Sequence, residues 1–151
     1  ERLRFCDQAG NIFTRSPQEF EVHYRHVPLL LNNYALSATL RGTPAPAEDI
    51  DLRMREAEKK RKASQPIAAS AGCIFKNPAQ LPAGKLVEQL GLKNRSVGAA
   101  RVSEIHGNFI INEGGAKARD VIELIHIIQS TAQTKMGIQL ETEVQIVGVD
   151  A

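Results

Sequence analysis

The stretch from residue 118 to residue 136 carries the clearest helix signal in the sequence. Apolar side chains recur there at intervals of three and four residues, at Val121, Leu124, Ile125, Ile128, Ala132 and Met136. This spacing places them on one face of an α-helix, and Gly137 is a typical C-terminal stop. A helix with one apolar face has to cover a core, so the segment predicts a folded domain in the last part of the chain. The apolar stripe itself is core and implies no cofactor.

Other short elements predict a compact α+β unit from residue 66 onward. Residues 82–91 begin with proline, carry apolar side chains at helical spacing and end at glycine, which favours a helix. Residues 108–112 are typical of a short buried strand bounded by amides. A last strand is predicted over residues 138–149, where apolar and polar side chains alternate, so that Glu143 points away from the core.

The first 43 residues predict β structure joined by turns. Leu3 and Phe5 alternate with charged residues, a turn signal follows at 7–10, and a return strand begins at Ile12, which together indicate a hairpin. Residues 16–19 resemble a helix start, and a second strand pair is predicted at 27–31 and 34–40. This segment has too few strands to be stable by itself. A mostly solvated helix is then expected over residues 47–62.

Composition narrows the class of protein. The 151 residues are 42% hydrophobic and 24% charged, and no apolar run approaches the roughly 20 residues that cross a bilayer. The net charge is only +2, and the basic run at residues 59–62 is expected to be the solvated end of a helix, so we expect neither a nucleic-acid nor a membrane partner. Cys6 and Cys73 are far apart, with no Cys/His cluster at metal-ligand spacing. No metal site is expected, and free thiols indicate a cytoplasmic protein.

Residues 71–78 bring a thiol, a flexible glycine, a cation and an amide together. Gly72 allows backbone conformations that a Cβ would forbid, and the apolar pair at 74–75 suits a short buried strand ended by Asn77 and the proline after it. Such a strand edge would present Cys73, Lys76 and Asn77 near one another. The alternative is a buried, inert cysteine beside a solvated lysine.

Two further side chains, Arg25 and Glu143, each have a functional and a purely structural interpretation. Arg25 follows Tyr24 in a turn, and the pair either lies exposed on the surface or aims a guanidinium at a carboxylate or phosphate. Glu143 is either a solvated carboxylate on an open sheet face or an acid beside a ligand cavity.

Five segments in one order then resemble a known family. They are residues 71–78, 83–88, 91–93, 102–112 and 140–144. Together they resemble the C-terminal half of the UDP-N-acetylenolpyruvoylglucosamine reductase family, flavoenzymes of bacterial peptidoglycan precursor synthesis, over about residues 66–149. Tyr24 and Arg25 resemble the Tyr-Arg motif of its second FAD-binding region, although His26 follows where that motif usually continues with a serine.

The resemblance implies residue roles. In this family NADPH reduces the flavin, the flavin delivers hydride to the enolpyruvyl double bond, and a serine or cysteine protonates the resulting centre. The resemblance assigns that proton-donor role to Cys73, and it implies that Arg25 and Glu143 act at the substrate carboxylate. A thiol carries a transferable proton, and an arginine or an acid could stabilise charge there. Asn77, His106 and, in the same loop, Lys76 are implied as substrate-binding residues, and Tyr24 as cofactor-binding.

The implied organisation is an α+β fold with three parts. Residues 1–45 would be the remnant of a β-rich FAD-binding domain, 46–65 a connecting helix and linker, and 66–151 a small substrate-binding domain. The Gly-rich loop that holds the flavin diphosphate in this family is absent from these residues. We therefore expect a fragment of the enzyme that does not retain FAD. Its expected partner is the N-terminal FAD-binding half, which these residues do not include.

Three functions remain open at this point. The first is a portion of the NADPH-dependent reductase that makes UDP-N-acetylmuramate from the UDP-sugar enolpyruvyl ether, inactive by itself. The second is a non-catalytic UDP-sugar-binding module. The third is a hydrolase with a Cys73 nucleophile and His106 as its base, which needs an oriented thiol and imidazole.

Overall fold

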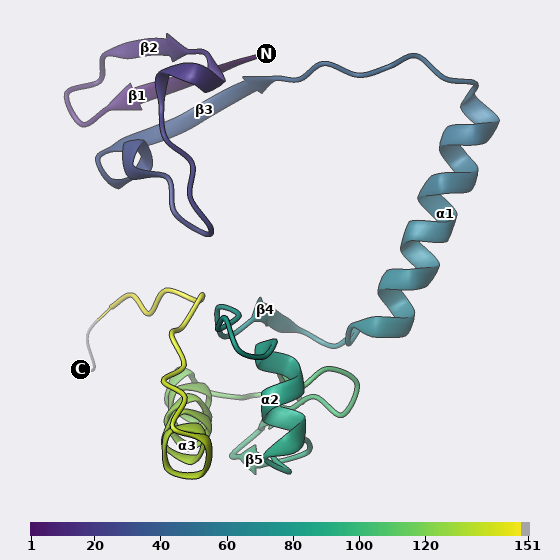
Figure 1. Cartoon of the computed structure of the whole chain (residues 1–151), viewed down its shortest axis with the longest axis vertical. Coiled ribbons are helices and arrows are strands. Elements are labelled where there is room, and N and C mark those ends of the chain that lie inside the picture. Colours follow the sequence, from purple (N-terminus) through teal and green to yellow (C-terminus); the bar gives the residue numbers. More distant parts are fainter. Residues whose placement is uncertain (149–151) are drawn as a thin grey trace. The chain divides into compact units, whose positions relative to one another are not determined.

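The computed structural model describes residues 1–148, and these form two compact units, Glu1–Ile50 and the residues from Asp51 onward (Figure 1). The order of elements is mixed α+β, as predicted, with antiparallel sheets in both units. Among the described residues no helix is both long and apolar enough to span a membrane.

The first unit contains a three-stranded antiparallel sheet in the order β2-β1-β3. Its strands are β1 (Arg2–Asp7), β2 (Ile12–Arg15) and β3 (Asn33–Thr39). The predicted hairpin is confirmed, because Phe5 of β1 pairs with Phe13 of β2. Phe5 is buried, its ring lies 5.6 Å from that of Phe13 and 5.8 Å from that of Phe20, and these contacts form the small core of the sheet.

Two short 3₁₀ helices interrupt this unit. The predicted helix start at Ser16 is confirmed by η1 (Pro17–Glu19), where the Glu19 carboxylate accepts a hydrogen bond from the Ser16 amide at 2.7 Å. The predicted strand at 27–31 is wrong, because the structure has η2 (Pro28–Leu31) there. Proline supplies the fixed φ of a helical first turn and lacks the donor that a strand ladder needs.

Helix α1 (Ala47–Ser64) follows, and every one of its side chains is exposed. The expectation of a solvated helix is therefore confirmed, including its basic end. Acidic residues lie in its first turn and basic residues in its last turn, an arrangement that opposes the helix dipole and stabilises both ends.

The second unit packs two helices with a four-stranded antiparallel sheet in the order β4-β7-β6-β5. The strands are β4 (Ser70–Cys73), β5 (Ser96–Val97), β6 (Ala100–Val102) and β7 (Phe109–Asn112). The helices α2 (Ala83–Gln89) and α3 (Ala118–Met136) contact one another, and α3 also contacts β5 and β6 (Figure 1). Both helices confirm predictions, and Gly137 ends α3 in the left-handed conformation, with φ of 65°.

One core holds this unit together. It draws on the segment after β4, both helices, the central strands and the last segment, through Ile74, Phe75, Leu86, Val87, Val102, Ile110, Leu124, Ile128 and Leu140. The predicted apolar stripe of α3 is confirmed at Leu124, Ile125, Ile128 and Ala132, which are buried, whereas Met136 is 39% exposed.

The segment after α3 departs from the prediction. Instead of a strand over residues 138–148, the structure has an irregular segment with a single β-bridge between Thr142 and Phe75, and Val149, the last residue of the predicted strand, lies outside the described residues. Leu140 is buried, but Ile146 is 59% exposed, so the alternating pattern does not mark one buried face. The predicted strand near Ile74 is likewise shifted, because β4 ends at Cys73 and Ile74 continues as buried, non-strand backbone.

Candidate functional site

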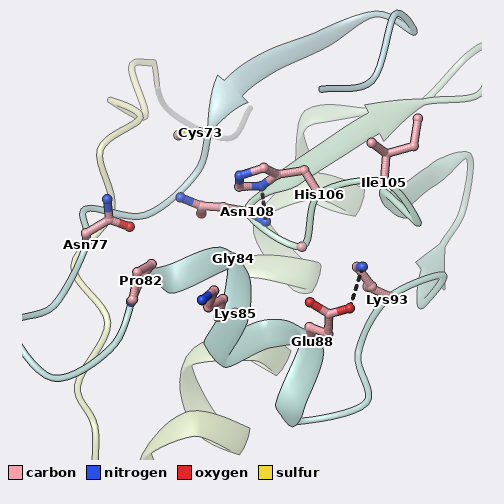
Figure 2. A pocket seen from close by; sticks show the side chains of 11 residues that line it. Cys73, Asn77, Pro82, Gly84, Lys85, Glu88, Lys93, Ile105, His106 and Asn108 are labelled. Carbon is pink, nitrogen blue, oxygen red and sulfur yellow. Dashed lines mark hydrogen bonds and ion pairs between the residues drawn. The ribbon is translucent and has the colours of Figure 1, made fainter. Parts of the chain in front are cut away.

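A glycine places the Cys73 side chain. Gly72 has a φ of +82°, which side-chain-bearing residues adopt at a cost, and the pairing of β4 with β7 shifts register between Ser70 and Cys73. Such a bulge redirects the side chain that follows it. Cys73 is half-buried, stands opposite Phe109 of β7 and lies on the wall of a cavity of about 340 Å³ (Figure 2).

This cavity lies between the end of β4, helix α2 and the loop before β7. Its walls are formed by Cys73, Asn77, Pro82, Gly84, Lys85, Glu88, Lys93, Ile105, His106, Gly107 and Asn108 (Figure 2). The structure therefore brings together three residues that the sequence singles out, Cys73, Asn77 and His106. The lining also includes three charged side chains, Lys85, Glu88 and Lys93.

Asn77 links the cavity to α2. Its side-chain oxygen accepts a hydrogen bond from the Ala83 amide at 3.0 Å, at the start of the helix. Asn77 therefore fixes the loop after Cys73 against the helix that forms the opposite wall. This helps to hold the two walls at a constant distance.

His106 is held by its loop. Its Nδ1 accepts a hydrogen bond from the Asn108 amide at 3.2 Å, and its ring meets the Phe109 ring edge-on, with 5.0 Å between centroids. The buried Ser103 hydroxyl accepts hydrogen bonds from the amides of Ile105 and His106, which closes the turn. The neutral imidazole consequently carries its proton on Nε2.

The charged side chains at the rim are partly paired. Lys93 donates to the Glu88 carboxylate at 2.8 Å, and this hydrogen bond, followed by the charge of Lys93, lowers the pKa of Glu88. Lys85 adds a positive charge on the same wall of the cavity. With Glu88 and Lys93 offsetting one another, the rim carries a net positive charge that suits an anionic ligand.

Lys76 and Glu143 lie where the segment after Cys73 contacts residues 141–143. The Lys76 ammonium pairs with Glu141, and its amide donates to the Glu141 carbonyl at 2.9 Å. The Glu143 amide donates to the Ile74 carbonyl at 2.8 Å, and the residue is half-buried. Neither lines the cavity described above, so a substrate contact by Lys76 and a catalytic role for Glu143 stay predictions.

Tyr24 and Arg25 belong to the first unit, where they form the tip of a two-residue turn. His23 and His26 exchange both main-chain hydrogen bonds across it, at 2.8 and 3.1 Å. Arg25 has a φ of +56°, which is unusual for a residue with a side chain, and its guanidinium lies 5.2 Å from the centre of the Tyr24 ring. Their predicted roles at substrate and cofactor stay predictions.

Several residues of the cavity were not singled out from the sequence. Gly84, Lys85, Glu88, Lys93 and Asn108 all lie in the segments on which the family resemblance rests, so the signal was present. Nothing in their local pattern predicts that α2 and the loop before β7 face one another. Within residues 1–148 no group of three or more His, Cys, Asp or Glu side chains could hold a metal ion.

Comparisons with known proteins agree with this arrangement. The family model described as "UDP-N-acetylenolpyruvoylglucosamine reductase, C-terminal domain" matches residues 64–147, which include the whole cavity. The chain is 42% identical over 146 residues to the UDP-N-acetylenolpyruvoylglucosamine reductase of Clostridium tetani, covering 95% of this chain and 48% of that protein. It is 46% identical over 145 residues to the protein of the same name from Bacillus licheniformis, covering 93% of this chain and 48% of the relative.

A solved structure has the same fold. The crystal structure of UDP-N-acetylenolpyruvylglucosamine reductase from Thermus caldophilus superposes with a TM-score of 0.82 at 36% sequence identity, covering 96% of this chain and 52% of that chain. The chain thus spans about half the length of the relatives it matches. With the family model matching the cavity-bearing unit and these relatives matching nearly the whole chain, the protein belongs to the UDP-N-acetylenolpyruvoylglucosamine reductase family.

Proposed function

We propose that this chain supplies the substrate side of a UDP-N-acetylenolpyruvoylglucosamine reductase. The complete enzyme would convert the enolpyruvyl ether of UDP-N-acetylglucosamine to UDP-N-acetylmuramate for peptidoglycan synthesis in the cytoplasm, and thereby serve cell-wall formation, cell shape and division. The observation that carries the proposal is the convergence of Cys73, Asn77 and His106 on one cavity with a net positive rim. A sugar nucleotide is extended, polar and anionic, which matches that cavity.

The chemistry assigned to Cys73 is proton delivery. Reduction of a carbon–carbon double bond adds a hydride to one carbon and a proton to the other. The half-buried thiol on the cavity wall gives up its S–H proton to the substrate carbon and becomes a thiolate, which then regains a proton from solvent. Arg25 and Glu143 would stabilise the charge that builds up on the substrate carboxylate while this transfer occurs.

Substrate binding is assigned to His106, in the loop before β7, and to Asn77, in the loop after Cys73. The Nε2–H of His106 donates to an acceptor oxygen, while Asn77 holds the entrance of the cavity in place. Lys76, in the same loop as Asn77, is proposed as a further contact for the sugar nucleotide. The positive charge of Lys85 favours the anionic part of the ligand.

The proposal for the complete enzyme includes FAD as the hydride carrier and NADPH as its reductant. We propose that the flavin cradle is formed mainly by the other half of the enzyme. In the first unit, a cavity of about 330 Å³ is lined by Arg2, Thr14, Ser16 and Glu19. Hydrogen bonds from the Ser16 amide and hydroxyl lower the pKa of Glu19, and its negative charge offsets that of Arg2, so this lining has no net positive charge to favour a diphosphate. We therefore propose that this chain alone neither retains FAD nor turns over substrate, and that Tyr24 contacts the cofactor only when the other half is present.

Calorimetry tests the proposal directly. The chain is titrated with the UDP-N-acetylglucosamine enolpyruvyl ether, and binding is expected to weaken in Asn77→Ala and His106→Ala but not in Lys135→Ala, an exposed charge in the last turn of α3. Absence of binding by the wild-type chain would overturn the proposal. NADPH oxidation and flavin absorbance are measured on the same sample. Stoichiometric bound FAD or turnover would refute the claim that this chain alone is inactive.

A further inference from the structure

The His106 ring lies closer to Gly84 than a Cβ atom at position 84 would permit. A Cβ built on Gly84 would lie 2.6 Å from Cε1 of His106, 3.1 Å from its Nδ1 and 3.4 Å from its Nε2. Figure 2 shows Gly84 in the first turn of α2, beside the loop that carries the imidazole. The ring therefore occupies the space that a methyl group at this position would need.

Helix α2 cannot move away to make room for a methyl group at position 84. Ala83, Leu86 and Val87 on either side of Gly84 are fully buried in the core. A Cβ on Gly107 would in turn lie 2.6 Å from the Gly84 carbonyl oxygen and 3.1 Å from Cβ of Val87, so the main chains of the loop and of α2 already approach as closely as they can. A methyl group at 84 would displace the half-buried ring rather than the helix.

The ring has one hydrogen-bonded arrangement in this place. The Asn108 amide donates to Nδ1 at 3.2 Å, and the Phe109 ring closes one edge. Because Nδ1 is the acceptor, Nε2 is the donor of the neutral ring, and Figure 2 shows this nitrogen on the side where Cys73 and Asn77 lie. Shifting the ring would break the hydrogen bond from the Asn108 amide to Nδ1. Neither the orientation of the ring nor its tautomer would then be fixed.

We propose that Gly84 is a positioning residue, which fixes the Nε2–H donor of His106 toward an acceptor oxygen of a UDP-sugar. This inference rests on the proposed function for the identity of the ligand. The placement of the ring by Gly84 rests on the contacts alone. Gly84 contributes no functional group. Its role is to leave room for the imidazole ring in this one position.

The first experiment needs no ligand. The chain is labelled with ¹⁵N in its histidines, and the shifts of the two ring nitrogens of His106 are measured in wild type and in Gly84→Ala. The wild type is expected to show the Nε2–H tautomer, and Gly84→Ala a mixture of tautomers. An unchanged pattern in Gly84→Ala, or the opposite tautomer in the wild type, overturns the proposal whatever the chain binds.

The second experiment is a double-mutant cycle with the UDP-sugar enolpyruvyl ether as the probe. Gly84→Ala and His106→Ala are each expected to weaken binding about tenfold, the effect of losing one hydrogen bond. The double variant should bind no more weakly than His106→Ala, because the methyl group then has no ring to displace. Additive losses would overturn the proposal. Gly42→Ala, with open space around its Cβ, is the matched control.

Folding is checked within the same cycle. If Gly84→Ala lowers the melting temperature, removal of the ring in the double variant should restore it to that of His106→Ala. A double variant that remains as unstable as Gly84→Ala would mean that the methyl group clashes elsewhere, and the positioning role is then wrong. If neither the wild type nor any variant binds the UDP-sugar, the proposed function is wrong. The ¹⁵N comparison still decides the role of Gly84 in that case.

Discussion

The side-chain amide of Asn108 is hydrogen-bonded to both main-chain groups of Phe75. Its Oδ1 accepts from the Phe75 amide at 2.9 Å, and its Nδ2 donates to the Phe75 carbonyl at 2.8 Å. The Asn108 carbonyl also accepts from the Ile74 amide at 2.9 Å. Asn108 therefore continues the sheet contact beyond the end of β4 and ties the loop of His106 to the segment of Cys73.

Asn108→Ala should destabilise the second unit strongly. It would leave two buried main-chain groups of Phe75 without a partner, and each such group costs about 1–3 kcal/mol. We expect the free energy of unfolding to fall by about 2–4 kcal/mol in urea denaturation. Gln139→Ala, which removes an exposed amide, should change it by less than about 0.5 kcal/mol. Equal stability of Asn108→Ala and wild type would contradict the role given to this amide.

Gly72→Ala should be costly for a different reason. Nothing lies within 4 Å of a Cβ at this position, so the cost comes only from the φ of +82°. We expect a loss of about 1–2 kcal/mol, the energy of placing an L-residue in the left-handed region. Gly42 has equally open surroundings without a positive φ, and Gly42→Ala should leave the melting temperature unchanged. The two variants together separate backbone strain from steric contact.

The ion pair of Glu88 and Lys93 should make a pH-dependent contribution to stability. The pKa of Glu88 is lower in the folded chain, first through the hydrogen bond from Lys93 and then through its charge. The contribution is therefore present above the unfolded-state pKa and is lost as the pH falls through the folded-state pKa. Glu88→Gln should melt below wild type at neutral pH, and the difference should vanish in acid and shrink in high salt. The exposed Glu123→Gln serves as control, and a difference that persists in acid would exclude this cause.

Leu140→Ala should release the segment that follows α3. Leu140 is 3% exposed, and its carbonyl accepts a hydrogen bond from Nε2 of Gln129 at 3.0 Å. Removing a buried leucine side chain costs about 2–5 kcal/mol, which chemical denaturation can measure. Ile146→Ala, at a position that is 59% exposed, should stay within about 0.5 kcal/mol of wild type. A similar loss of stability in both variants would instead support the predicted strand with one buried face.

The elements that sequence alone predicts are those whose signal is local. The periodicity of α3 and the stop at Gly137 are properties of one stretch, and the structure reproduces them at Ala118–Met136. Strands β5 and β6 were missed because two or three residues are too few to show alternation. The last segment was mistaken for a strand because its alternation is real, whereas over residues 138–148 the structure has one isolated bridge, from Thr142 to Phe75.

The same distinction applies to the site. Cys73, Asn77 and His106 stand in segments whose residue types are informative, and the structure gathers them around one cavity. Gly84 has no chemistry to detect, and its importance lies in a through-space contact with His106. Such contacts depend on how α2 meets the loop before β7, which no short pattern records.

The single bridge at Thr142 has a consequence for how the protein is made. The Ile74–Lys76 backbone exchanges hydrogen bonds with Glu141 and Glu143, and Lys76 and Glu141 are 65 positions apart. Contacts so distant in sequence form slowly, because a long stretch of chain must be ordered before they gain anything. On the ribosome, the segment that carries Cys73 emerges before residues 141–143 and gains these hydrogen bonds only after they have followed. Synthesis that stalls before them would leave the backbone of Ile74–Lys76 without these hydrogen bonds.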